Sequence, residues 1–158
     1  MDIETVRLVS LARYLHELGV SNLRSGNDLR LFAAVNLLQD AVEFFLIAVA
    51  RQVGARIEDR MDFDKYFVAI DEKISPKQLP FKSKLLTLNK IRVNAKHYGI
   101  QPDRDECRRL ALSVREFFDE VTTSHLGASF ATLSAIDLHR DGEVRNALLE
   151  AKTALAGC

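Results

Sequence analysis

Two side chains that could do chemistry stand five positions apart in this sequence. Arg92 and His97 lie in the stretch Arg92-Val93-Asn94-Ala95-Lys96-His97-Tyr98-Gly99. Around them, residues 73–102 contain seven lysines and arginines and no aspartate or glutamate. A concentration of positive charge attracts anions, and an imidazole changes charge near neutral pH. The segment therefore favours a site for an anionic ligand such as a phosphodiester.

The overall composition limits the class of protein that could contain such a site. The chain has 158 residues, of which 47% are hydrophobic, enough for one domain with a single core. Its 22 basic and 22 acidic residues cancel, which argues against indiscriminate coating of nucleic acid but allows a local patch. No secretory leader is apparent, and the longest apolar run, 41–50, contains Glu43 and is too short to span a bilayer. We expect a cytoplasmic protein that does not enter a membrane.

Nearly every segment has the periodicity of a helix, and no strand pattern is present. Gly19 and Gly99 are expected to end the first and fourth helices, and Asp28 and Asp103 to cap the second and fifth. The main helices are expected over 3–18, 28–53, from 62 to before 75, from after 80 to 98, and 103–121, and two shorter ones over 129–138 and 143–156. The sequence thus predicts an all-α, up-and-down bundle of four to five main helices, residues 1–124, followed by a C-terminal helical extension, residues 125–158, that packs on the bundle or on a partner.

The fourth predicted helix has apolar residues on two faces. Leu85, Leu88, Ile91 and Ala95 form the stripe expected to face the bundle, whereas Leu86 and Val93 lie on the other side together with His97. A second apolar face calls for a partner, and the simplest is the same helix of a second copy across a two-fold axis.

Arg92 and His97 are about 140° apart around an ideal helix, so one chain alone does not bring them together. A two-fold axis could combine both pairs in one cleft. The alternative is that Arg92 and Lys96 are solvated, and that His97 simply favours the C-terminal end of its helix.

The second predicted helix is apolar on most sides but carries a short polar stripe. The stripe consists of Asn36, Gln39, Asp40 and Glu43. Its carboxylates could orient the histidine or pair with the arginine. A window open to solvent is the alternative interpretation.

These residues resemble the HEPN superfamily, whose members are small helical bundles, usually dimeric and in many cases metal-independent endoribonucleases. The family's mark is an arginine followed a few residues later by a histidine near the end of a late helix, and Arg92 and His97 match it. The runs 89–99 and 37–46 are also similar to the family's pattern, and the resemblance covers residues 1–124. It implies an RNA-cleaving homodimer, formed through the fourth helix, of the kind that acts as a toxin or phage-defence effector beside an antitoxin or a neighbouring defence protein.

The resemblance also assigns roles to residues. It implies catalysis by Arg92 and His97 without metal or cofactor, and the four histidines have no zinc-ligand spacing. Supporting or RNA-contacting roles are expected for Asn89, Asn94, Lys96, Asp40 and Glu43. Active members commonly have a polar residue after the arginine, where this chain has Val93. The alternative is therefore a non-catalytic HEPN-like module that binds RNA, nucleotide or a partner protein.

Overall fold

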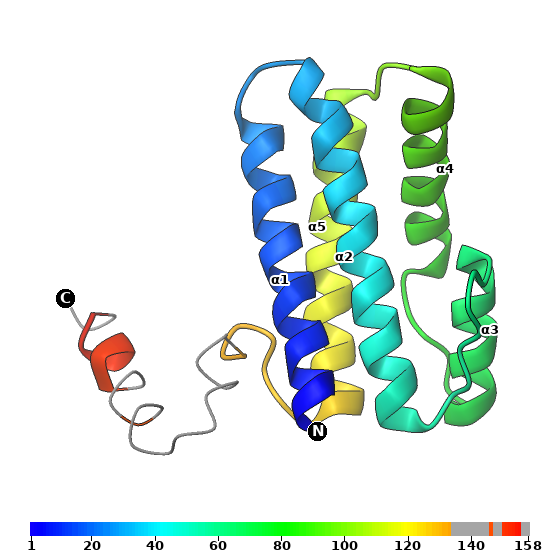
Figure 1. Ribbon diagram of the computed structural model, residues 1–158, viewed down its shortest axis with the longest axis vertical. Helices are drawn as coiled ribbons and strands as arrows, with labels where there is room; N and C mark the ends of the chain where they lie inside the picture. The colour runs from blue at the N-terminus through cyan, green and yellow to red at the C-terminus, as the bar shows by residue number, and fades with distance from the viewer. Residues whose placement is uncertain (134–145, 147–149, 156–158) are drawn as a thin grey trace.

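The computed structural model describes residues 1–133, 146 and 150–155, and these residues contain helices and no strand. The elements are α1 (Ile3–Arg24), α2 (Leu29–Val53), α3 (Phe63–Ile74), α4 (Lys82–Tyr98), α5 (Arg104–Val121) and a short π-helical turn, η1 (Thr122–Leu126). In Figure 1, α1, α2, α4 and α5 run up and down beside one another, and α3 lies against the lower part of α2 and α4. The prediction of an all-α protein is confirmed.

Helix α2 lies at the centre of this arrangement and contacts α1, α3, α4, α5 and η1. Twelve of its 25 residues are buried, among them Leu38, Phe45 and Leu46, which are completely enclosed. By length and composition alone α2 could cross a membrane, but more than half of its most apolar stretch is buried inside the protein. Its position is that of a core helix.

An aromatic cluster joins α2 to α5 and to the chain that follows η1. The ring centroid of Phe118 lies 4.5 Å from that of Phe45 and 4.9 Å from that of Phe130. Phe117 contacts Phe45 edge-on at 5.4 Å. Such pairs add to the stabilisation that comes from burying their area. The packed bundle therefore continues past residue 124.

Arg13 of α1 holds this last segment in place. Its Nη1 donates to the carbonyl oxygens of Ala131 at 2.8 Å and Leu133 at 2.6 Å. Residues 129–133 form a turn, not the start of the helix expected from 129. Within the second short helix expected, Asn146 and residues 150–155 are helical. The remaining residues of both expected helices lie outside the described part of the chain.

The prediction that Gly19 ends the first helix is wrong. Helix α1 continues to Arg24, and Gly19 is buried within it. A Cβ at this position would lie 3.0 Å from Leu38 Cγ and 3.4 Å from the Ala34 carbonyl oxygen. Gly19 is therefore required for the close approach of α1 and α2, and not for a turn.

Other helix ends agree with the sequence patterns. Gly99 follows α4 in the left-handed conformation, with φ of 64°, and the Asp103 carboxylate accepts from the Glu106 backbone N–H at 2.7 Å. Asp28 precedes α2 as expected, but its side chain makes no cap hydrogen bond. It pairs instead with Arg104 of α5 at 2.7 Å.

The contact of Gly19 with α2 gives a stability prediction. Gly19→Val should destabilise the protein by about 1–3 kcal/mol, because the added methyl groups force Leu38 and the α2 backbone away. Ser21→Val places the same side chain at an exposed position of the same helix and should change stability much less. Urea unfolding followed by circular dichroism measures both, and equal effects of the two variants would contradict the close-packing explanation.

His16 gives a prediction of pH dependence. It is buried, with 6% of its surface exposed, and its Nε2 lies 3.3 Å from the Ala111 carbonyl oxygen. Burial lowers the pKa of His16, although the contact with the carbonyl acts in the opposite direction. The unfolded chain therefore takes up a proton near pH 6.5 while the folded chain does not, and stability is lost as pH falls from there towards the folded pKa.

We expect the free energy of unfolding to fall between pH 7.5 and pH 5.5, and to fall less in His16→Leu. His97→Gln, a change at an exposed histidine, is the matched control and should keep the wild-type pH dependence. Urea titrations at the two pH values decide the matter. An unchanged pH dependence in His16→Leu would show that this buried ring is not responsible.

Candidate functional site

The cations of residues 73–102 form no ion pair with any residue that the structure describes. Six ion pairs are formed among the described residues, and none uses a side chain from this segment. The paired cations are Arg7, Arg13, Arg51, Arg104, Arg108 and Arg115. Helix α4 itself contains no acidic residue. Its positive charge is therefore available to an external anion.

Arg92 lies on the side of α4 that packs against the bundle. Leu85, Leu88 and Ala95 on that side are buried, Ile91 is half-buried against the core, and Arg92 is half-buried among them. Its Nε atom is buried and has no hydrogen-bond partner among the described residues. An unsatisfied buried donor is costly, and such a group in a native structure needs an explanation. A bound anion would satisfy it.

His97 lies in the last turn of α4, just before Gly99 ends the helix. It is exposed, as is the neighbouring Lys96. No hydrogen bond joins His97 to Arg92 in the described chain, in keeping with the angle of about 140° expected between positions five apart. A single chain thus presents the two candidate catalytic groups on different sides of α4.

The supporting residues lie on α4 and α2, and no hydrogen bond among the described residues joins their side chains to those of Arg92 or His97. Asn89, Asn94 and Asp40 are half-buried. Glu43 accepts a hydrogen bond from Gln39 Nε2 at 3.2 Å. The charge of Glu43 also adds to the effect of burial in raising the pKa of Tyr66 on α3. The described residues contain no ion pair between Asp40 or Glu43 and Arg92.

Gln39 was grouped with the polar stripe in the sequence, and its position in the structure is more specific. It is completely buried, so the stripe is not simply a solvent window, and its Oε1 has no hydrogen-bond partner. Gln101 Nε2 donates to the Asp28 carbonyl oxygen at 3.1 Å, so the chain just past the end of α4 lies beside the start of α2. Arg92, about two turns before the end of α4, therefore faces the N-terminal half of α2, which contains Gln39. The facing helices therefore hold one unsatisfied donor and one unsatisfied acceptor.

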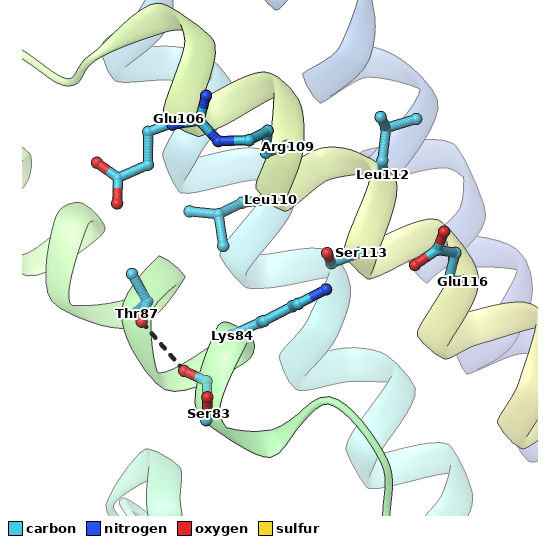
Figure 2. A pocket seen from close by; sticks show the side chains of 9 residues that line it. All are labelled: Ser83, Lys84, Thr87, Glu106, Arg109, Leu110, Leu112, Ser113 and Glu116. Carbon is cyan, nitrogen blue, oxygen red and sulfur yellow. Dashed lines mark hydrogen bonds between the residues drawn. The ribbon is translucent and has the colours of Figure 1, made fainter.

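A groove between α4 and α5 was not foreseen from the sequence. It has a volume of about 450 Å³. In Figure 2, Lys84 extends across the groove towards α5, with Glu106 and Glu116 towards its two ends. The lining contains Glu106 and Glu116 of α5 as well as Lys84 and Arg109, so its charge is mixed and the groove does not extend the acid-free surface of α4. Its lining residues are Ser83, Lys84, Thr87, Glu106, Arg109, Leu110, Leu112, Ser113 and Glu116.

A second hollow of about 440 Å³ lies between α1 and α5, and it too was missed. Its lining includes His16 of α1 and Arg108 and Arg115 of α5, none of which was a candidate site residue in the sequence. The spacing of seven between these arginines was a signal that they share one helix face. The sequence could not show that α1 completes the hollow.

The described residues contain no group of three or more His, Cys, Asp or Glu side chains placed to hold a metal ion. His16 is buried, His125 is half-buried and His97 is exposed, whereas His139 lies outside the described residues. Cys107 is buried in α5, and burial raises the pKa of its thiol to about 11, as expected of an inert core residue.

Comparison of this chain with protein-family models, with curated proteins and with solved structures gives no match.

Proposed function

We propose that this protein is a HEPN-like, metal-independent endoribonuclease that works as a homodimer. The observation that carries the proposal is the state of α4: an acid-free helix whose cations have no ion pair within the described part of the chain, with the exposed His97 in its last turn. The unsatisfied Nε of Arg92 on the same helix adds to it. A negatively charged backbone such as RNA supplies the anion that such a surface lacks.

The chemistry follows from the two side chains. The 2′-hydroxyl of one nucleotide attacks the adjacent phosphorus, the bond to the 5′-oxygen breaks, and the products are a 2′,3′-cyclic phosphate and a 5′-hydroxyl. His97 accepts the proton of the attacking hydroxyl or donates one to the leaving oxygen, and two copies of His97 in a dimer supply both functions. Arg92 stabilises the charge that develops on the phosphorane oxygens. Asn94 and Lys96 position the phosphate, with Asn89 beside them.

The dimer is proposed to form through the outer side of α4. Leu86 is half-buried against the chain's own core, so it is not free for a partner, whereas Val93 is half-buried without packing against that core. Tyr98 and Ile100, at the end of α4, are 71% and 54% exposed. A second copy would cover Val93, and Ile100, seven positions further on, extends this apolar contact past the end of the helix.

A charged residue introduced at the centre of the proposed interface tests whether the dimer forms there. Val93→Asp should convert a dimer to a monomer, because burying an unpaired charge in an interface costs several kcal/mol. Thr87→Asp introduces the same charge at an exposed position of α4 outside this contact and should leave the dimer intact. Analytical ultracentrifugation at micromolar protein measures both. A wild-type protein that sediments as a monomer would remove the dimer and the shared site with it.

Catalysis is tested by replacing the two candidate groups. His97→Ala and Arg92→Ala should each reduce cleavage of RNA by about 10²- to 10⁴-fold, since a general acid–base or a charge-stabilising group contributes that much. Arg92→Ala should also bind RNA more weakly, and Lys96→Ala should mainly reduce the salt dependence of binding. The matched controls are His125→Ala and Arg30→Ala, which remove the same side-chain types outside the site. Gel assays with structured and single-stranded RNA give the rates.

The products identify the mechanism. Cleavage should persist in EDTA and leave a cyclic phosphate, whereas complete loss on chelation, restored by magnesium, would contradict the proposal.

The second candidate is a non-catalytic HEPN-like module. It is favoured by Val93 at a position that is commonly polar in active members, and by the separation of Arg92 from His97 around α4. RNA binding without cleavage, unaffected by His97→Ala, would establish this alternative.

A further inference from the structure

The hollow between α1 and α5, here called the α1/α5 pocket, is formed by one face of each helix. Its residues on α1 and on α5 recur at spacings of three, four and seven, which places them on the same side of their helix. Its volume of about 440 Å³ falls in the range of small-molecule sites. The lining residues are His16, Val20, Leu23 and Arg24 from α1 and Arg108, Ala111, Leu112 and Arg115 from α5.

The walls of the pocket are apolar. Leu23 is buried and Val20 is half-buried, and both border the hollow from α1. Leu112 borders it from α5 and is 66% exposed, which leaves a large apolar side chain largely in water. His16 closes one part of the wall with its Nε2 directed at the Ala111 carbonyl oxygen. An apolar body in the pocket would remove Leu112 from water, and this would favour binding.

The charged residues that line the pocket all have the same sign. They are Arg24, Arg108 and Arg115, and none of the described residues brings a carboxylate into the lining. Arg24 has no ion pair among the described residues. The pairs of Arg108 with Asp105 and of Arg115 with Asp119 lie within one helix turn and are exposed. Such pairs contribute little and leave the guanidinium groups open to another anion.

The register of α1 and α5 fixes where the arginines lie along the pocket. Arg104 Nη1 donates to the Leu23 carbonyl oxygen at 2.9 Å, so the first turn of α5 lies beside the last turn of α1. Arg24 follows Leu23 in the chain, and Arg108 lies one turn after Arg104. At the other end, His16 and Ala111 are in contact. Arg24 therefore lies at one end of the pocket, Arg108 between the two ends and Arg115 past Ala111 at the other, so positive charge follows the whole length of the apolar wall.

We propose that the α1/α5 pocket binds a small amphipathic anion. Its apolar body, about the size of two fused rings, lies against Val20, Leu23 and Leu112, and its single carboxylate or phosphate is bound by Arg24 and Arg108. Planar guanidinium groups bind either anion through paired hydrogen bonds. This site is separate from the α4 surface and does not depend on any cleavage of RNA.

The test compares three probes that share one ring system: 1-naphthoate, 1-naphthyl phosphate and the neutral 1-naphthalenemethanol. In isothermal titration calorimetry at low salt, the protein should bind at least one of the two anions about tenfold or more tightly than it binds the neutral probe. The relative affinities of the two anions distinguish a carboxylate ligand from a phosphate ligand. Amide shifts in ¹⁵N spectra should map the bound anion to residues 16–24 and 108–115.

Neighbouring arginines provide the matched control. The double variant R24Q/R108Q should reduce binding of the anion about tenfold, to the level of the neutral probe. R109Q changes the next residue of α5, which lines the α4/α5 groove instead, and should bind as wild type does. All three arginines are exposed, so these variants should fold, and circular dichroism melts confirm it.

Three results would overturn the proposal. One is equal binding of the neutral and anionic probes, or none at millimolar concentration. Another is an equal loss of affinity in R109Q and R24Q/R108Q. The third is that Leu112→Arg converts an oligomer to a monomer while no probe binds, which would assign this face to a second copy of the chain.

Discussion

The burial of α2 is the constraint on which the rest of this structure depends. A helix that is apolar on most of its surface must be enclosed, and α1, α3, α4 and α5 all pack against it. Gly19 lets α1 approach closely on one side, and the rings of Phe117 and Phe118 pack on Phe45 on another. The orientation of the candidate residues on α4 follows from which side of that helix faces α2.

In helix α4, the side that packs on α2 also contains Arg92, which is proposed to bind the anion. The side that packs on α2 contains Leu85 and Leu88, and Arg92 lies next to them. A long arginine stem can be buried along apolar surface, but its Nε then requires a partner that the described chain does not provide. Gln39 on α2 is likewise left with an unsatisfied acceptor. Two such groups in one region are a cost to stability that binding or rearrangement could remove.

The charges of the protein are divided between two roles. Arginines outside the acid-free segment form every ion pair among the described residues, mostly within a helix turn or between adjacent helices. The lysines and arginine of α4 form none. A chain with no net charge can therefore present a local positive surface, because its acidic residues lie on other elements. The α1/α5 pocket, lined by three arginines, is a second positive region.

Local patterns were sufficient to predict most of the helices. The ends of α4 at Gly99 and of α5 at Asp103 depend on backbone conformation and on one side-chain bond, both of which are encoded within a few residues. Gly19 was misinterpreted because a glycine in a helix is explained only by what lies opposite it, and Leu38 is far away in the sequence. Asp28 likewise pairs with Arg104, 76 residues further on, instead of capping its own helix.

The same distinction between local pattern and tertiary contact applies to the candidate site. The sequence alone determined that Arg92, Lys96 and His97 share one acid-free helix, because spacing and charge are properties of the chain itself. Only the tertiary structure decided that Arg92 is partly enclosed while His97 is exposed, that Gln39 is buried, and that α1 and α5 enclose a hollow lined by three arginines. Burial and the closure of a pocket depend on which faces of distant helices meet. That is set by the enclosure of α2 and not by any local pattern.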